Sequence, residues 1–177
     1  MTLLIMGVAG SGKTTVGKQV ARKLAFEFID GDDFQPSENV EKIRGGQALS
    51  DADRYAWFSR LKSGILERSR RGNSLVIACS ALKREYRSFL LSGLGKTDII
   101  YLKIDPKTAI ARLSGRANHF FPASLWATQF EILEAPRAAI TIDARQPVDW
   151  VVGQIVLQVQ RRFPKDDSKD QQLEASD

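Results

Sequence analysis

The sequence predicts an α/β fold in which a central parallel sheet of five strands carries helices on both faces. Short apolar runs alternate along the chain with longer stretches of helical periodicity, an order typical of consecutive β-α-β units. The apolar runs are continuous rather than alternating, as in strands that are buried on both faces of a parallel sheet. A chain of 177 residues with 43% hydrophobic residues can build one core of ordinary size, so we expect a single domain over residues 1–164.

Each element follows from its local pattern. Runs rich in Ile, Val and Leu predict strands at residues 3–6, 26–29, 75–79, 99–104 and 139–142. Helices are predicted at residues 13–25, 51–70, 106–113, 125–133 and 147–162, the longest having Trp57, Leu61 and Ile65 at four-residue spacing. The expected order is β-α-β-α-α-β-α-β-α-(α)-β-α, an open three-layer sandwich with right-handed crossovers that gathers ligands at the carboxyl ends of its strands.

The distribution of charge indicates an anionic ligand. The formal net charge is +5, but residues 165–177 hold two cations and five anions, so the rest of the chain carries about +8. We expect that polar tail to be disordered, because it has too little apolar surface to offset the entropy of ordering. Lys and Arg are interspersed with acids rather than gathered in runs, which argues against nucleic acid as a partner.

Two further features bear on the class of protein. No apolar run reaches the roughly 18 residues of a membrane span, and no basic leader precedes the first apolar run, so we expect a cytoplasmic protein with no membrane partner. The single cysteine, Cys79, lies in an apolar run. It excludes a disulfide framework and is predicted to be a buried core thiol.

A glycine-rich motif directly follows the first predicted strand and opens the first predicted helix. It matches the Walker A pattern and consists of Gly7, Val8, Ala9, Gly10, Ser11, Gly12, Lys13 and Thr14, followed by Thr15. Glycines let backbone N–H groups turn inward around phosphates, and the helix N-terminus adds partial positive charge. In this pattern Lys13 reaches the β- and γ-phosphates and Thr14 ligates Mg²⁺. The sequence therefore predicts a P-loop NTPase fold that binds ATP through these residues.

A cluster of carboxylates follows the second predicted strand, beside the P-loop. It consists of Asp30-Gly31-Asp32-Asp33. Strand-like alternation would point Asp30 and Asp32 to the same side, one toward a metal ion and the other toward an acceptor hydroxyl. The third predicted strand ends without an aspartate, so Asp30 is predicted to bind the metal ion together with Thr14.

Basic residues occupy two further segments. After the third strand comes Cys79-Ser80-Ala81-Leu82-Lys83-Arg84-Glu85-Tyr86-Arg87, which suits an anionic or polyhydroxyl substrate, or alternatively forms the charged start of a helix. Between the fourth and fifth strands, Arg112, Arg116 and His119 precede Phe120-Phe121-Pro122. This second segment, about residues 115–124, is predicted to be a lid over bound phosphates, where guanidinium groups would offset the charge of phosphoryl transfer.

These blocks together resemble the gluconokinase family. They are the P-loop, Asp30-Gly31-Asp32, Asp51-Ala52-Asp53-Arg54, Cys79-Ser80-Ala81-Leu82-Lys83, His119-Phe120-Phe121 and Gln129-Phe130-Glu131-Ile132-Leu133-Glu134. The resemblance extends from residue 3 to about residue 152, and the Cys-Ser-Ala-Leu-Lys and His-Phe-Phe blocks are its most specific parts. It implies an adenylate-kinase-like or shikimate-kinase-like fold, ATP with Mg²⁺, a homodimer in some members, and phosphorylation of gluconate to 6-phosphogluconate.

The resemblance also implies roles at the acceptor site. Asp32 would orient or deprotonate the acceptor hydroxyl. Arg54 would hold the substrate carboxylate, with help from Lys83 and Arg87. The predicted substrate-binding residues are Asp32, Arg54, Ser80, Lys83, Arg87 and His119.

At the nucleotide site, we expect Lys13 of the P-loop and Arg116 of the lid to neutralise charge on the transferred phosphoryl group. By analogy with related small-molecule kinases, Arg112 and Pro147 would lie on the two faces of adenine. The predicted catalytic residues are therefore Lys13, Asp32 and Arg116.

Three positions depart from the pattern of the family, and two other functions stay open. Gln35 stands where His is common, Ala48 where Pro is usual, and Asn118 where Gly precedes His119.

A kinase of the same fold could act on shikimate or another hydroxy acid. From another class, a nucleotide-dependent switch or nucleic-acid-binding ATPase would also carry a P-loop and positive charge.

Overall fold

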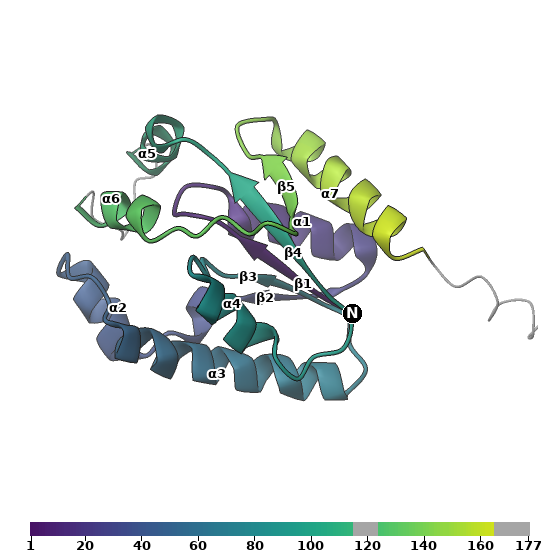
Figure 1. Cartoon of the computed structure of the whole chain (residues 1–177), viewed down its shortest axis with the longest axis horizontal. Helices are drawn as coiled ribbons and strands as arrows, with labels where there is room; N and C mark the ends of the chain where they lie inside the picture. The colour runs from purple at the N-terminus through teal and green to yellow at the C-terminus, as the bar shows by residue number, and fades with distance from the viewer. Residues whose placement is uncertain (115–123, 165–177) are drawn as a thin grey trace, which may run out of the picture.

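The computed structural model describes residues 1–114 and 124–164 (Figure 1). Five strands form one parallel sheet in the order β2-β3-β1-β4-β5. The elements, in chain order, are β1 (Thr2–Met6), α1 (Lys13–Leu24), β2 (Glu27–Asp30), the 3₁₀ helix η1 (Gly31–Phe34), α2 (Ser37–Arg44), α3 (Asp51–Arg70), β3 (Leu75–Ala78), α4 (Arg84–Leu91), β4 (Thr97–Lys103), α5 (Pro106–Ser114), α6 (Ser124–Glu131), β5 (Ile140–Asp143) and α7 (Val148–Arg162).

This topology confirms the α/β fold and the order of elements predicted from the sequence. All five predicted strands are present with their ends shifted by one or two residues, and α3 has the predicted bounds. The expected order includes α2 and α4 but gives no bounds for them. Because α4 begins at Arg84, the second half of the basic stretch after β3 is indeed the start of a helix.

The pleat of the sheet separates the core into two layers. In β1, Leu3 and Ile5 join the cluster formed with α1 and α7, whereas Leu4 joins the cluster formed with α3 and α4. Figure 1 shows these two pairs of helices on opposite faces of the sheet. All of β1 and β3 is buried, which explains why their sequences are continuously apolar.

The helix α3 supplies residues both to this core and to the functional site. It begins with a capping box, in which the Ser50 hydroxyl accepts from the Asp53 backbone N and the Asp53 carboxylate accepts from the Ser50 backbone N. Its buried side chains pack under β2 and β3 and include Phe58 and Leu61. This fixes the start of α3 near the carboxyl ends of these strands.

At the carboxyl edge of the sheet, the strands lead into the P-loop, η1 and the loop after β3. Figure 1 shows α2, α5 and α6 gathered around this edge, toward its left side. Among residues 1–114 and 124–164, no helix has both the length and the apolar character that crossing a bilayer requires.

Candidate active site

The P-loop between β1 and α1 has the backbone that a phosphate cradle requires. Gly10 and Gly12 have φ angles of +82° and +92°, which residues with side chains rarely adopt. A Cβ at Gly10 would also lie 2.6 Å from the carbonyl oxygen of Ala109 in α5. Lys13, the first residue of α1, donates from Nζ to the carbonyl oxygen of Val8 at 3.1 Å. The loop thus curls over a helix N-terminus, where N–H groups and the helix dipole favour an anion.

Asp30 is directed at the P-loop. Its Oδ2 accepts from the Thr14 hydroxyl at 2.8 Å, and its Oδ1 accepts from the Asp32 backbone N at 3.2 Å. The strand-like alternation predicted through Asp30-Gly31-Asp32 is wrong, because β2 ends at Asp30 and the chain continues as a 3₁₀ helix. The two carboxylates consequently face different surroundings.

The Asp32 carboxylate is exposed and is oriented by its neighbours. Gln35 Nε2 donates to Asp32 Oδ1 at 3.1 Å. Trp57 Nε1 donates to the carbonyl oxygen of Gly31 at 2.7 Å, so α3 fixes the turn that carries Asp32. A Cβ at Gly31 would lie 2.8 Å from the carbonyl oxygen of Ala78, and only glycine allows this close approach to β3.

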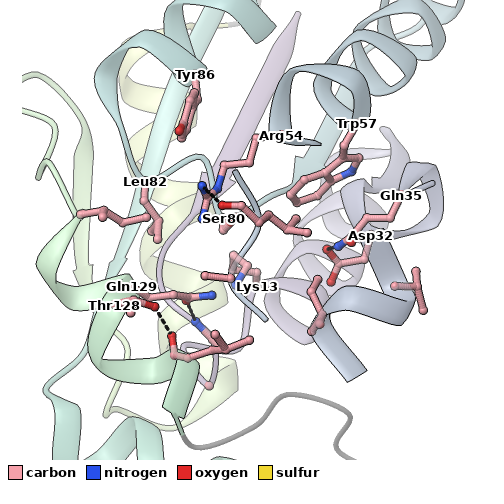
Figure 2. A pocket seen from close by; sticks show the side chains of 18 of the residues that line it. Lys13, Asp32, Gln35, Arg54, Trp57, Ser80, Leu82, Tyr86, Thr128 and Gln129 are labelled. Atoms are coloured by element: carbon pink, nitrogen blue, oxygen red, sulfur yellow. Dashed lines mark hydrogen bonds between the residues drawn. The ribbon is translucent and has the colours of Figure 1, made fainter. Parts of the chain in front are cut away.

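The P-loop and Asp32 open into one cavity of about 570 Å³. Figure 2 shows that Lys13, Asp32, Arg54, Ser80 and Gln129 approach it from different segments. Its lining residues are Ala9, Gly10, Gly12, Lys13, Thr14, Thr15, Asp32, Gln35, Val40, Ile43, Arg44, Ala48, Leu49, Arg54, Trp57, Phe58, Ser80, Leu82, Tyr86, Leu125, Thr128, Gln129 and Ile132. The volume is typical of small-molecule sites.

Arg54 lies in the cavity wall, one turn into α3. Its Nη1 donates to the carbonyl oxygen of Leu49 and lies 3.6 Å from Asp51 Oδ1. Asp51 in turn accepts from the Tyr86 hydroxyl and from Lys83 Nζ, and these two hydrogen bonds lower the pKa of its carboxyl. Lys83 interacts with Tyr86 as well as with Asp51, and hydrogen bonding to these two side chains raises the pKa of its ammonium group. Lys83, a predicted substrate-binding residue, is thus paired with Asp51, and it is not among the residues that line the cavity.

Arg87 lies inside the protein, in contrast to the prediction that it helps to bind substrate. It is 4% exposed, and its Nη1 donates to the carbonyl oxygens of Ala81 and Leu82 at 3.0 and 2.7 Å. Burial lowers the pKa of its guanidinium. In this structure Arg87 supports the backbone of the loop after β3, because its cation binds the carbonyl groups of two successive residues of that loop.

The predicted buried thiol is confirmed, and several other predicted residues lie away from the cavity. Burial raises the pKa of Cys79 to about 12, so its thiol is not a nucleophile at neutral pH. Arg112 is half-buried in α5 and Pro147 is exposed at the N-cap of α7, and neither lines the cavity. The predictions for Arg116, His119, Asn118 and most of the lid fall outside the described residues.

Sequence reasoning missed several residues that form the cavity. Trp57, Tyr86, Leu125, Thr128, Gln129 and Ile132 line it, although none of them was a candidate site residue. Trp57 belongs to the apolar spacing of α3, which indicates a core residue, and Tyr86 lies in the basic stretch after β3, where only Ser80 and basic residues are predicted to contact substrate. Gln129 lies in one of the blocks that carry the family resemblance, and this was the signal that could have found it.

The oxygen atoms at the end of β2 and the start of α1 fit a hard cation. A hydroxyl and a carboxylate, from Thr14 and Asp30, lie 2.8 Å apart. Within the described ranges, no group of three or more His, Cys, Asp or Glu residues could hold a metal ion. Mg²⁺ keeps several waters and is usually held by one or two carboxylates plus substrate phosphates, so this sparse donor set suits it.

The sheet order, the P-loop and the adjoining cavity define a P-loop kinase of the shikimate-kinase-like class, and a family model described as shikimate kinase matches residues 9–134. The thermosensitive gluconokinase of Escherichia coli K12 is 42% identical over 137 residues, 77% of this chain and 73% of that protein. The probable gluconokinase of Xenopus tropicalis is 38% identical over 181 residues, 92% of this chain and 95% of its own. A crystal structure of a gluconokinase from Sinorhizobium meliloti 1021 has a TM-score of 0.81 at 35% identity and covers 90% of this chain and 91% of that chain. The chain belongs to the gluconokinase family.

Proposed function

We propose that this chain transfers the γ-phosphoryl group of ATP to the terminal hydroxyl of gluconate and forms ADP and 6-phosphogluconate. The observation that carries this proposal is the shared cavity: Lys13, Asp32 and Arg54 all line it. A hydroxy acid offers a hydroxyl to phosphorylate and a carboxylate to recognise, and the cavity contains a partner for each. The relatives that are named gluconokinases support gluconate as the acid.

Asp32 is the proposed general base. The acceptor oxygen attacks the γ-phosphorus, its proton passes to the Asp32 carboxylate, and the bond from phosphorus to the β–γ bridging oxygen breaks. Gln35 holds one carboxylate oxygen of Asp32, which leaves the other to face the acceptor. Lys13 follows the P-loop pattern and neutralises charge on the transferred group.

Arg54 is the proposed partner of the gluconate carboxylate. Within the described part of the chain, the guanidinium group of Arg54 contacts Leu49 and Asp51, and both contacts use Nη1. The hydrogens on Nη2 and Nε therefore remain for a ligand. Ser80 lines the same cavity and supplies a hydroxyl for the polyol chain. We assign no substrate contact to Arg87, because its guanidinium is already bound to backbone carbonyls.

The nucleotide side of the proposal rests on the P-loop. Thr14 and Asp30 would hold Mg²⁺, which when bound offsets the charge of the β- and γ-phosphates. Arg112 and Pro147 as the adenine contacts, and Arg116 and His119 as lid residues, stay predictions. A nucleotide soak of crystals tests them directly.

The decisive experiment is ADP release measured with Mg²⁺-ATP and a panel of acceptors: gluconate, shikimate, glycerate, gluconic lactone and none. Gluconate-dependent turnover, with 6-phosphogluconate identified as the product, is the expected result. Turnover with shikimate but not with gluconate would keep the kinase and reject the substrate. ATP hydrolysis that needs no acceptor and rises with RNA or DNA would reject the proposed class.

Two variants test the roles proposed for Lys13 and Asp32. Lys13→Ala is expected to abolish turnover while the melting temperature stays within a few degrees of the wild type. Asp32→Asn, which keeps the shape and the contact with Gln35, is expected to lower kcat by about 10² to 10⁴-fold, the usual contribution of a general base. Retained activity in either variant would contradict the role given to that residue.

A further inference from the structure

The segment 129–134 connects the nucleotide and acceptor sides of the cavity. At one end, Gln129 Oε1 accepts from the backbone N of Ala9 in the P-loop at 2.7 Å. At the other end, the Glu134 backbone N donates to the Leu82 carbonyl at 3.0 Å, and the Glu134 carboxylate accepts from the Arg84 backbone N at 2.6 Å. The segment is thus bound to both walls, and it is a block of the family resemblance to which the proposed mechanism gives no role.

Gln129 meets the P-loop at the peptide that also contacts the catalytic lysine. The carbonyl oxygen of Val8 accepts from Lys13 Nζ, and the N–H of the same peptide unit, on Ala9, donates to Gln129. No cis peptide bond occurs in the described residues, so the carbonyl and the N–H point to opposite sides of this peptide. Gln129 therefore fixes the orientation of the peptide beside Lys13.

The contact with Ala9 also fixes the orientation of the Gln129 amide. A backbone N–H can only donate, so the oxygen of the amide must face Ala9 and the NH₂ group must face away. Figure 2 shows that Gln129 extends from α6 into the cavity toward Lys13, with its nitrogen directed inward. Across residues 1–114 and 124–164, the NH₂ group donates to no protein atom, and the hydrogen bond of the Gln129 side chain is the one that its oxygen accepts.

From this geometry, and resting on the proposed phosphoryl transfer, we infer that Gln129 is a catalytic residue that donates from Nε2 to an oxygen of the transferred phosphoryl group. Charge develops on these oxygens in the transition state, and donors held in place beforehand stabilise it most strongly. The contact with Ala9 supplies this prior fixation, because it holds the amide at one end. A neutral donor adds to the cation of Lys13 without a further charge in the cavity.

The test compares Gln129→Glu with Gln129→Ala. A glutamate keeps an oxygen acceptor for Ala9 N–H but replaces the NH₂ donor by an oxygen that repels phosphate. We expect kcat to fall by about 10² to 10³-fold in Gln129→Glu, the range for loss of one transition-state donor, and no further in Gln129→Ala. Ala127→Glu adds a carboxylate to the exposed face of the same helix and is the control expected to retain activity.

Nucleotide affinity shows whether Gln129 donates to the γ-phosphate or only supports the P-loop. We expect Gln129→Glu to weaken a non-hydrolysable ATP analogue by at least about tenfold more than ADP, because only the analogue carries a γ-phosphate. Equal changes for both nucleotides, or activity of Gln129→Glu within threefold of the wild type, would overturn the inference and leave Gln129 as a support of the P-loop. This binding measurement needs no acceptor, so it decides the matter even if gluconate proves not to be the substrate.

Discussion

The hydrogen bond from Trp57 to Gly31 offers a sharp test of how the fold supports the site. Trp57 is 4% exposed, and its Nε1 lies 2.7 Å from the carbonyl oxygen between Asp30 and Asp32. Trp57→Phe removes the donor and leaves a buried carbonyl without its partner, which costs about 1–3 kcal/mol. The smaller ring also leaves a void of about 40 Å³, which adds about 1 kcal/mol at about 24 cal/mol per Å³.

The expected loss of unfolding free energy is therefore about 2–4 kcal/mol, and the melting temperature should fall by about 4–16 °C. Urea unfolding and differential scanning calorimetry measure these two quantities. Trp150→Phe is the matched control, because Trp150 is 47% exposed on α7 and the same exchange should change little there. A melting temperature of Trp57→Phe within 1 °C of the wild type would refute the argument that this bond fixes the turn. At a temperature well below both transitions, kcat should also fall about tenfold or more, because Asp32 is held less well.

Three further predictions concern the acceptor site, the thiol and the start of α3. Arg54→Gln should raise the KM for gluconate by about 10 to 100-fold with a smaller change in kcat, since it removes a charged hydrogen bond to the carboxylate; an unchanged KM in steady-state assays would place the carboxylate elsewhere. Cys79, with a pKa raised to about 12 by burial, should resist a thiol reagent at pH 8 in the native state and react fully in denaturant; rapid native labelling would contradict its burial. Hydrogen bonds from Lys42 and Ser50 lower the pKa of Asp53 to about 2 from its ordinary 3.8, so the carboxylate stabilises the fold above pH 4 and this contribution is lost as the pH falls toward 2. The deficit in melting temperature of Asp53→Asn should accordingly be full at pH 7 and shrink between pH 4 and 2, whereas a deficit independent of pH would exclude this linkage.

Most of the fold could be predicted from the sequence because its signals are local. A continuous apolar run identifies a buried strand, and the capping box at Ser50 and Asp53 begins α3 at the predicted residue. The 3₁₀ helix after Asp30 was not predicted, because it depends on a tertiary contact: Trp57, 26 residues further along the chain, binds the carbonyl of Gly31. Local pattern cannot report such a contact.

The site divides in the same way. The P-loop and its link from Thr14 to Asp30 follow from motifs that each carry their own chemistry, so these predictions placed the residues together correctly. Arg87 shows the opposite case. An arginine in a basic stretch suggests a ligand contact, but the fold brings two loop carbonyls within 3.0 Å of it and uses its charge inside the protein. Gln129 and Ala9 are 120 residues apart, and only the folded chain brings them together.

Cationic groups line the cavity at separate places, which supports the proposal that it binds two anions, the phosphates of ATP and the carboxylate of the acceptor. Lys13 lies at the P-loop end and Arg54 at the start of α3, and Asp32 lies on η1 in the same cavity. Asp51 lies 3.6 Å from Arg54, while Tyr86 and Lys83 engage the same carboxylate, so the charge of Arg54 is only partly compensated. With the carboxylate bound to Arg54 as proposed, the opposite end of the acceptor would lie toward the P-loop. The proposal therefore predicts phosphorylation at the carbon farthest from the carboxylate, rather than at a random hydroxyl.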